Sequence, residues 1–65
     1  MKKLNDGWFL VRLHQARKEK PEHPDYFSDW IELVDGEWQL GEYEKRCDFS
    51  EVIISESDFD KRRNR

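Results

Sequence analysis

Residues 30–41 read Trp30-Ile31-Glu32-Leu33-Val34-Asp35-Gly36-Glu37-Trp38-Gln39-Leu40-Gly41, an alternation of apolar and polar side chains around Asp35-Gly36. An Asp-Gly pair between two alternating runs predicts a β-hairpin with a type I′ turn. A two-residue turn fixes the register, so Leu33 should lie opposite Trp38 and Ile31 opposite Leu40. One face of the hairpin is then apolar and the other mostly polar, which indicates a hairpin packed on a core from one side.

The run from Trp8 to Leu13 predicts a first strand because it is rich in aromatic and branched apolar residues. Phe9, Val11 and Leu13 share one face. The opposite face is also mostly apolar, so we expect this strand to be central or covered on both sides. Residues 14–25 are polar and contain two prolines, which predicts a long loop.

The pattern after Gly41 is weaker. We expect residues 42–44 to continue the third strand past a bulge at Gly41, and residues 45–48 to form a turn. Residues 51–55 predict a fourth strand with Val52 and Ile54 directed inward. Ser55 precedes Asp58 by three positions, which is the spacing of a helix N-cap and predicts a short C-terminal helix or a frayed end.

These segments predict one mainly β domain over residues 1–60, followed by a basic C-terminal tail over residues 61–65. The expected fold is a small, curved antiparallel sheet or an SH3-like, partly open barrel of three to five strands. The alternative is a sheet of three or four strands with one covering helix. Chains of this size bury only roughly 60% of their unfolded surface, so we expect marginal stability and either a monomer or a homodimer.

The net charge of −3 conceals a segregation of charge along the chain. Residues 1–24 carry six basic and three acidic side chains, residues 25–60 carry two basic and twelve acidic ones, and residues 61–65 carry four basic ones. An acidic face attracts a basic protein surface and repels nucleic acid. It either imitates the phosphates of DNA or is a solvated face that keeps the protein soluble. The acidic residues around the hairpin are Asp25, Asp29, Glu32, Asp35, Glu37, Glu42 and Glu44.

The sequence contains no constellation that carries recognisable chemistry, so we expect no enzyme activity and no catalytic residue. The two histidines and Cys47 lack the ligand spacing of structural zinc, and residues 48–60 lack the glycine of a calcium loop. We therefore expect no metal and no other cofactor. One cysteine excludes an internal disulfide, and no apolar stretch is long enough for a signal peptide or a membrane span. We expect a soluble, cytoplasmic protein.

Aromatic residues near the hairpin are the candidates for contact with a partner, because Trp and Tyr are enriched in interface hot spots. By the hairpin register Trp30 falls opposite Gly41, so its ring either covers that glycine or belongs to an exposed patch. The expected partner is a host or cellular protein with a basic surface. The predicted partner-binding residues are Trp30, Tyr26, Phe27, Asp29, Glu32, Glu37 and Tyr43. The alternative is a nucleic-acid-associated protein that binds phosphates through Arg12, Arg17, Lys18, Arg62 and Arg63.

The run Asp35-Gly36-Glu37-Trp38-Gln39-Leu40-Gly41, followed by Val52-Ile53-Ile54, resembles in outline the SH3-like and Tudor-like small barrels. This resemblance implies an aromatic-lined groove for a peptide, although the sequence lacks the full aromatic cage and the peptide-groove residues of those families. In size, tryptophan content and clustered charge the chain is also similar to small accessory proteins of phages and prophages. That resemblance implies a modulator or inhibitor that occludes a surface of a host protein.

Overall fold

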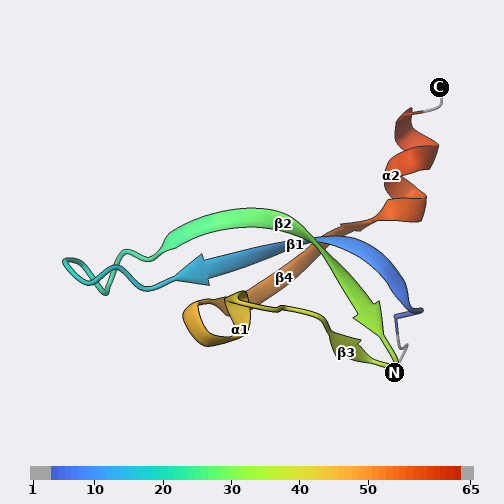
Figure 1. The fold of residues 1–65 in the computed structure, drawn as a ribbon. Helices are drawn as coiled ribbons and strands as arrows, with labels where there is room; N and C mark the ends of the chain where they lie inside the picture. Colours follow the sequence, from blue (N-terminus) through green and yellow to red (C-terminus); the bar gives the residue numbers. More distant parts are fainter. Residues whose placement is uncertain (1–3, 64–65) are drawn as a thin grey trace.

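The computed structural model describes residues 4–63, which form a curled antiparallel sheet and two short helices (Figure 1). The elements are β1 (Gly7–Gln15), β2 (Asp25–Val34), β3 (Glu37–Trp38), α1 (Tyr43–Arg46), β4 (Asp48–Ser55) and α2 (Glu56–Arg63). The strand order is β3-β2-β1-β4, and every pair is antiparallel. The fold is therefore mainly β, a four-stranded half-barrel with a short C-terminal helix, and the predicted fold class is confirmed.

The β2–β3 hairpin turns at Asp35 and Gly36, whose φ angles of 51° and 78° are both positive, as a type I′ turn requires. Leu33 pairs with Trp38, as predicted. The longer pairing predicted for this hairpin is wrong, because β3 ends at Trp38. Only the Gln39 N–H extends the ladder, and it donates to the carbonyl of Glu32 at 2.9 Å.

The chain leaves the sheet after Gln39 and does not continue the third strand. Gly41 has a φ of 59°, which reverses the backbone, and Tyr43–Arg46 form the single turn of α1. The prediction of a strand over residues 42–44 is therefore wrong. The predicted turn over residues 45–48 is replaced by the end of α1, Cys47 and the first residue of β4.

The loop predicted over residues 14–25 is shorter than expected. β1 and β2 pair without interruption from Gly7 opposite Leu33 to Gln15 opposite Asp25, so only residues 16–24 lie outside the strands. This loop forms the tip of the β1–β2 hairpin, at the end of the molecule away from α2 (Figure 1). Because β1 and β2 continue to pair, His14, Gln15 and Asp25 belong to strands, although their polar composition predicted a loop.

The core lies on the concave face of the half-barrel. Phe9, Val11 and Leu13 are buried, as the alternation in β1 predicted, and Ile31 and Leu33 of β2 are buried beside them. Segment 39–47 contributes to the same core, with one buried and two partly buried side chains that pack against it. These are Cys47, Leu40 and Tyr43.

Trp38 closes the half-barrel. It belongs to edge strand β3, yet its ring lies 5.2 Å from the ring of Phe49 on the opposite edge strand, β4. In a flat sheet these two edges would be about 14 Å apart, since neighbouring strands are about 4.8 Å apart. The Trp38 ring also makes an edge-to-face contact with Phe9 at 5.4 Å. The curl of the sheet thus brings both edges together on one indole ring.

β4 contains two register shifts relative to β1, which change the face that its side chains occupy. Val52 pairs with Val11 and packs against the core, as predicted. Ile54 pairs with Leu10, and therefore lies on the convex face. The prediction that Ile54 points into the core is wrong, because the extra residue Ile53 inverts the alternation.

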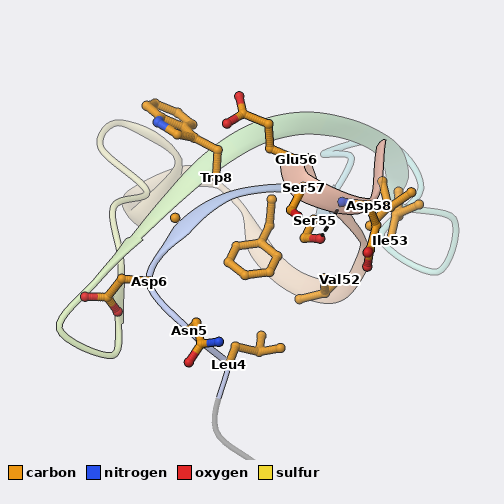
Figure 2. A pocket seen from close by; sticks show the side chains of 13 residues that line it. Leu4, Asn5, Asp6, Trp8, Val52, Ile53, Ser55, Glu56, Ser57 and Asp58 are labelled. Carbon is orange, nitrogen blue, oxygen red and sulfur yellow. Dashed lines mark hydrogen bonds between the residues drawn. The ribbon is translucent and has the colours of Figure 1, made fainter. Parts of the chain in front are cut away.

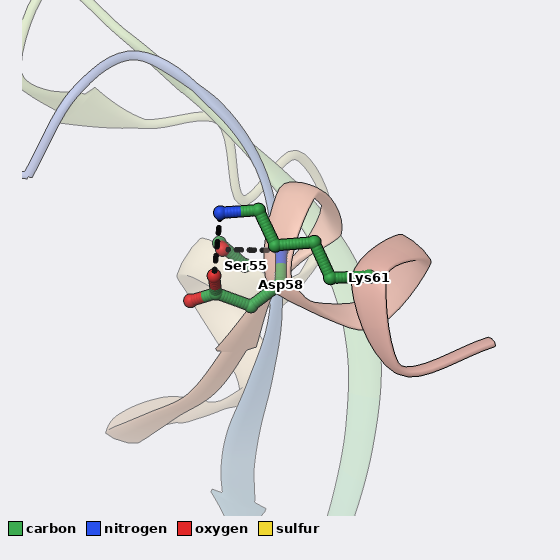
Figure 3. Close-up of polar contacts among 3 residues, drawn as sticks. All are labelled: Ser55, Asp58 and Lys61. Carbon is green, nitrogen blue, oxygen red and sulfur yellow. Dashed lines mark hydrogen bonds and ion pairs between the residues drawn. The ribbon is translucent and has the colours of Figure 1, made fainter. Parts of the chain in front are cut away.

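α2 begins as the sequence predicted. The Ser55 hydroxyl accepts a hydrogen bond from the Asp58 N–H at 3.1 Å, which is an N-cap contact (Figure 3). The Lys61 ammonium lies 4.0 Å from the Asp58 carboxylate on the same helix. Residues 61–63 of the expected basic tail form the last turn of α2, where positive charge complements the helix dipole. Asn64 and Arg65 lie outside the described residues.

Candidate partner-binding surface

The sheet divides the predicted partner-binding residues between its two faces. Successive side chains of a strand point to opposite faces. Tyr26, Trp30 and Glu32 alternate on β2 and lie on the convex face, together with Glu37, which pairs with Val34. The other members, Phe27, Asp29 and Tyr43, lie on the concave face. The structure does not bring the seven residues together in one patch.

The concave members hold the fold together. The Asp29 carboxylate accepts the Trp30 N–H at 2.8 Å through Oδ1 and the Tyr43 hydroxyl at 2.7 Å through Oδ2. The ring of Tyr43 also lies 5.5 Å from that of Phe27. Since both oxygens of Asp29 have intramolecular donors, this carboxylate positions α1 under the sheet.

The hydrogen bond to Asp29 raises the pKa of Tyr43, and burial and the negative charge of Asp29 raise it further. The neutral phenol donates this bond, whereas a phenolate would place a second negative charge beside Asp29. α1 is therefore attached to the sheet by a contact that requires protonated Tyr43.

The convex members form an aromatic surface, and α2 covers only the part of it around Trp30. Tyr26 is 59% exposed, and its ring lies 5.5 Å from that of His14. Trp30 is partly buried and makes an edge-to-face contact with Phe59 of α2 at 5.5 Å. Trp8, which pairs with Glu32, is 45% exposed on the same face. We define the convex surface as Trp8, Tyr26, Trp30, Glu32, Glu37 and Phe59.

Trp30 matches neither of the two roles expected from the hairpin alone. It pairs with Leu10 of β1 and not with Gly41, because β3 is too short to reach that position. Part of its ring is covered by Phe59, and a groove of about 240 Å³ remains between Trp30 and α2. The guanidinium of Arg63 lies 5.9 Å from the Phe59 ring at the edge of this groove.

A larger groove of about 700 Å³ opens at the end of the half-barrel (Figure 2). It lies between the start of β1, the end of β4 and the first turn of α2. Leu4 and Asn5 form one side of the groove, and Ser55, Ser57 and Asp58 belong to the other. Among the described residues, the charged side chains that line it are acidic, namely Asp6, Glu56 and Asp58.

Asp6 has a structural role that the sequence did not indicate. Its carboxylate accepts the backbone N–H of Asp35 at 2.7 Å and that of Gly36 at 3.4 Å, and so binds the N-terminal segment to the hairpin turn. Asp6 and the residues before it line the groove, so one wall of the groove is held in place by this contact. No local pattern relates Asp6 to a turn about thirty residues later, so sequence reasoning had no signal for it.

The basic residues of the alternative function are distributed over the molecule. Arg12 lies 3.3 Å from Glu51, and Arg17 lies 3.8 Å from Asp25, so both cations face carboxylates. Lys18 belongs to loop 16–24, whereas Arg62 and Arg63 belong to α2 at the other end of the molecule (Figure 1). The longest dimension of the molecule is 43 Å. The structure does not assemble these five residues into one phosphate-binding surface.

Within residues 4–63, no three His, Cys, Asp or Glu side chains are grouped so that they could hold a metal ion. Cys47 is a free thiol, and it is buried in the core. His14 lies 3.5 Å from Asp48 through Nε2, and its buried Nδ1 atom has no hydrogen-bond partner in this part of the chain. Neither described helix is long and apolar enough to cross a membrane.

No protein-family model matches this chain, and comparisons with curated proteins and with solved structures found no significant match. The resemblances to SH3-like barrels and to phage accessory proteins therefore stay predictions. A function has to be inferred from the convex surface.

The sequence reasoning missed two residues of the convex surface, Trp8 and Phe59. The alternation of β1 already assigned Trp8 to the face opposite Phe9, Val11 and Leu13, but it left open whether that face is buried. Nothing local indicated that Phe59 would contact Trp30, because that contact depends on the direction in which α2 leaves β4.

Proposed function

We propose that this chain is a non-enzymatic protein-binding module that contacts a basic host or cellular protein through its convex surface. The observation that carries the proposal is the exposed aromatic face of β1 and β2, where Trp8 and Tyr26 are about half exposed although both have large apolar rings. Exposed aromatic residues beside acidic ones are the composition of an interface anchor with a polar rim.

The charge of the hairpin supports a basic partner. Glu32 and Glu37 lie on the convex face, and residues 25–44 contain seven acidic and no basic side chains. Such a surface accelerates encounter with a positively charged protein and repels nucleic acid. In its sharpest form the module occludes a nucleic-acid groove on its target by imitating DNA phosphates, and so acts as a modulator or inhibitor of the kind that phages encode.

The test is affinity capture from a cell lysate, with and without nuclease, followed by identification of the recovered proteins by mass spectrometry. Tyr26→Ala is the first variant, because Tyr26 is exposed and far less involved in packing than Trp30. We expect one stoichiometric protein that survives nuclease, with affinity for Tyr26→Ala lowered about tenfold, the loss of one anchor of moderate strength. Trp30→Ala should weaken capture as well, but it also removes the contact with Phe59.

The matched control is Ile53→Ser, which removes a side chain that is 45% exposed but belongs to a bulge of β4, outside the convex surface. Capture by this variant should equal that of the wild type, and circular dichroism should show that all variants fold. Equal losses for Tyr26→Ala and Ile53→Ser would refute the convex surface as the contact. A broad set of partners that disappears on nuclease treatment would instead support the nucleic-acid alternative.

A further inference from the structure

The outer edge of β2 is mostly unpaired. β3 pairs with only Leu33 and Val34, and Gln39 adds one hydrogen bond to Glu32. Within the described residues, no strand lies beside the outer edge of residues 25–31. The inner edge of the same strand pairs with β1 from Asp25 to Leu33 without a bulge. β2 is therefore regularly paired along its inner edge and mostly unpaired along its outer edge.

The alternation of the backbone identifies the free groups on this edge. The Glu32 carbonyl points outward, since it accepts the Gln39 N–H from the β3 side. Every second residue of a strand directs its N–H and C=O to the same side, so those of Tyr26, Ser28 and Trp30 also point outward. The Trp30 N–H is occupied by the Asp29 carboxylate. The described residues supply no strand partner for the backbone groups of Tyr26 and Ser28 or for the carbonyl of Trp30, so these groups can pair with another strand.

The other edge of the sheet is protected in a way that β2 is not. β4 carries two register shifts, and bulges of this kind discourage the addition of a further strand. Among the outward N–H groups of Tyr26, Ser28 and Trp30, the described residues supply a side-chain acceptor for Trp30 alone, the Asp29 carboxylate. The two edges therefore differ, and only β2 presents a regular ladder.

The charges around this edge indicate what would pair with it. Asp25 and Asp29 lie on one face of the open ladder, and the aromatic rings of Tyr26 and Trp30 lie on the other. The Asp29 carboxylate accepts its two hydrogen bonds from neutral groups and so keeps its negative charge, whereas Asp25 already faces Arg17. An extended peptide with basic residues at alternate positions would place them on the face of Asp29 and its apolar residues beside the rings. A second copy of this chain would instead place two acidic edges side by side, which is unfavourable.

The geometry points to strand addition. We infer that the outer edge of β2 binds an extended basic segment of the partner protein as a fifth, edge-paired strand, through the outward backbone groups of Tyr26 and Ser28. The inference rests on the proposed function and specifies how the partner is held. Main-chain hydrogen bonds supply affinity in this mode, and the alternate side chains supply specificity.

The test is residue-resolved amide hydrogen exchange by NMR on the whole protein, with a short synthetic peptide that alternates lysine with valine. In the free protein the Tyr26 and Ser28 amides should exchange fast, whereas the inward amides of Phe27 and Asp29 should be protected by β1. Saturating lysine–valine peptide, at up to about 1 mM, should slow exchange at Tyr26 and Ser28 about tenfold. A peptide that alternates glutamate with valine is the charge-matched control and should leave both rates unchanged.

Two substitutions separate the backbone contact from the side chain. Ser28→Pro deletes an outward N–H that no residue of the sheet uses, so the protein should fold and the protection by the peptide should be lost. Ser28→Ala keeps the N–H and should behave as the wild type. Because the exchange rates of the wild type are themselves diagnostic, the test does not depend on the folding of Ser28→Pro.

Unchanged exchange at Tyr26 and Ser28 with saturating lysine–valine peptide would overturn the inference. So would protection of these amides that rises with protein concentration without peptide, since the occupant would then be a second copy. If the wild type and Ser28→Pro capture the same lysate protein equally while Tyr26→Ala does not, the proposed function stands and strand addition fails. If the peptide protects the edge but no protein is captured, the proposed function fails.

Discussion

Replacement of Trp38 by alanine should cost this protein a large part of its stability, because one indole ring joins both edges of the half-barrel. Trp38 contacts Phe9 at 5.4 Å and Phe49 at 5.2 Å, and it pairs with Leu33. Truncation removes both aromatic contacts and leaves a cavity between strands that are not neighbours in the sheet. The curl of the sheet then loses its main contact between opposite edges.

The magnitude follows from the partial burial of this residue. Loss of a fully buried tryptophan costs about 3–5 kcal/mol, and Trp38 is only partly buried, so we expect about 3 kcal/mol. Each of its two ring contacts supplies about 1 kcal/mol of this. A domain of this size has a total stability of roughly 3–10 kcal/mol, and 1 kcal/mol shifts its Tm by about 4–8 °C. Trp38→Ala should therefore lower Tm by about 12–24 °C or leave the chain partly unfolded at room temperature.

The assay is thermal unfolding followed by circular dichroism, with Trp8→Ala as the matched control. Trp8 is the same residue type, but it is 45% exposed and lies on the convex face of β1. We expect its substitution to lower Tm by less than half as much. Equal shifts for Trp38→Ala and Trp8→Ala would refute the conclusion that the half-barrel is closed through Trp38.

Two further predictions concern the attachment of the helices. Ser55→Ala should remove the N-cap of α2 and cost about 1 kcal/mol of stability. It should also change the tryptophan emission of the protein, because Phe59 moves away from Trp30. Ser57→Ala is the control and should leave both stability and emission unchanged, so equal effects of the two substitutions would contradict the capping role. The Asp29 hydrogen bond raises the pKa of Tyr43 above its ordinary value of about 10. The contribution of this hydrogen bond to the stability of the fold is therefore complete below about pH 10 and is lost as the pH rises through the higher pKa of the folded state. The urea midpoint of the wild type should therefore fall more between about pH 8 and pH 11 than that of Tyr43→Phe, and parallel decreases would show that this phenol does not contribute.

The part of the fold that the sequence predicted depends on interactions between residues close together in the chain. Asp35-Gly36 specifies a type I′ turn because both positions need positive φ, and this turn sets the register of Leu33 and Trp38. Ser55 caps α2 through a residue three positions later. The alternation of Phe9, Val11 and Leu13 assigns the buried face of β1 without knowledge of its neighbours.

The candidate site was predicted less well, for two different reasons. Tyr26 and Phe27 are adjacent in the sequence and therefore lie on opposite faces of β2, so the rule of alternation already argued against one common patch. The exposure of Trp30 could not be predicted in this way, because it depends on the direction in which α2 leaves β4 and so on whether Phe59 reaches the indole ring.

The sequence by itself determined the turn, the helix cap and the buried face of β1, because each is fixed by φ preferences or periodicity within a few residues. Only the tertiary structure decided four features: the tie from Asp6 to the hairpin turn, the Asp29–Tyr43 bond, the closure by Trp38 on Phe49, and the face of Ile54. The face of Ile54 depends on where β4 bulges, and the other three depend on how segments distant in the sequence meet across the curled sheet. Those are properties of the whole packed sheet, in which strands distant in sequence must bury one shared core.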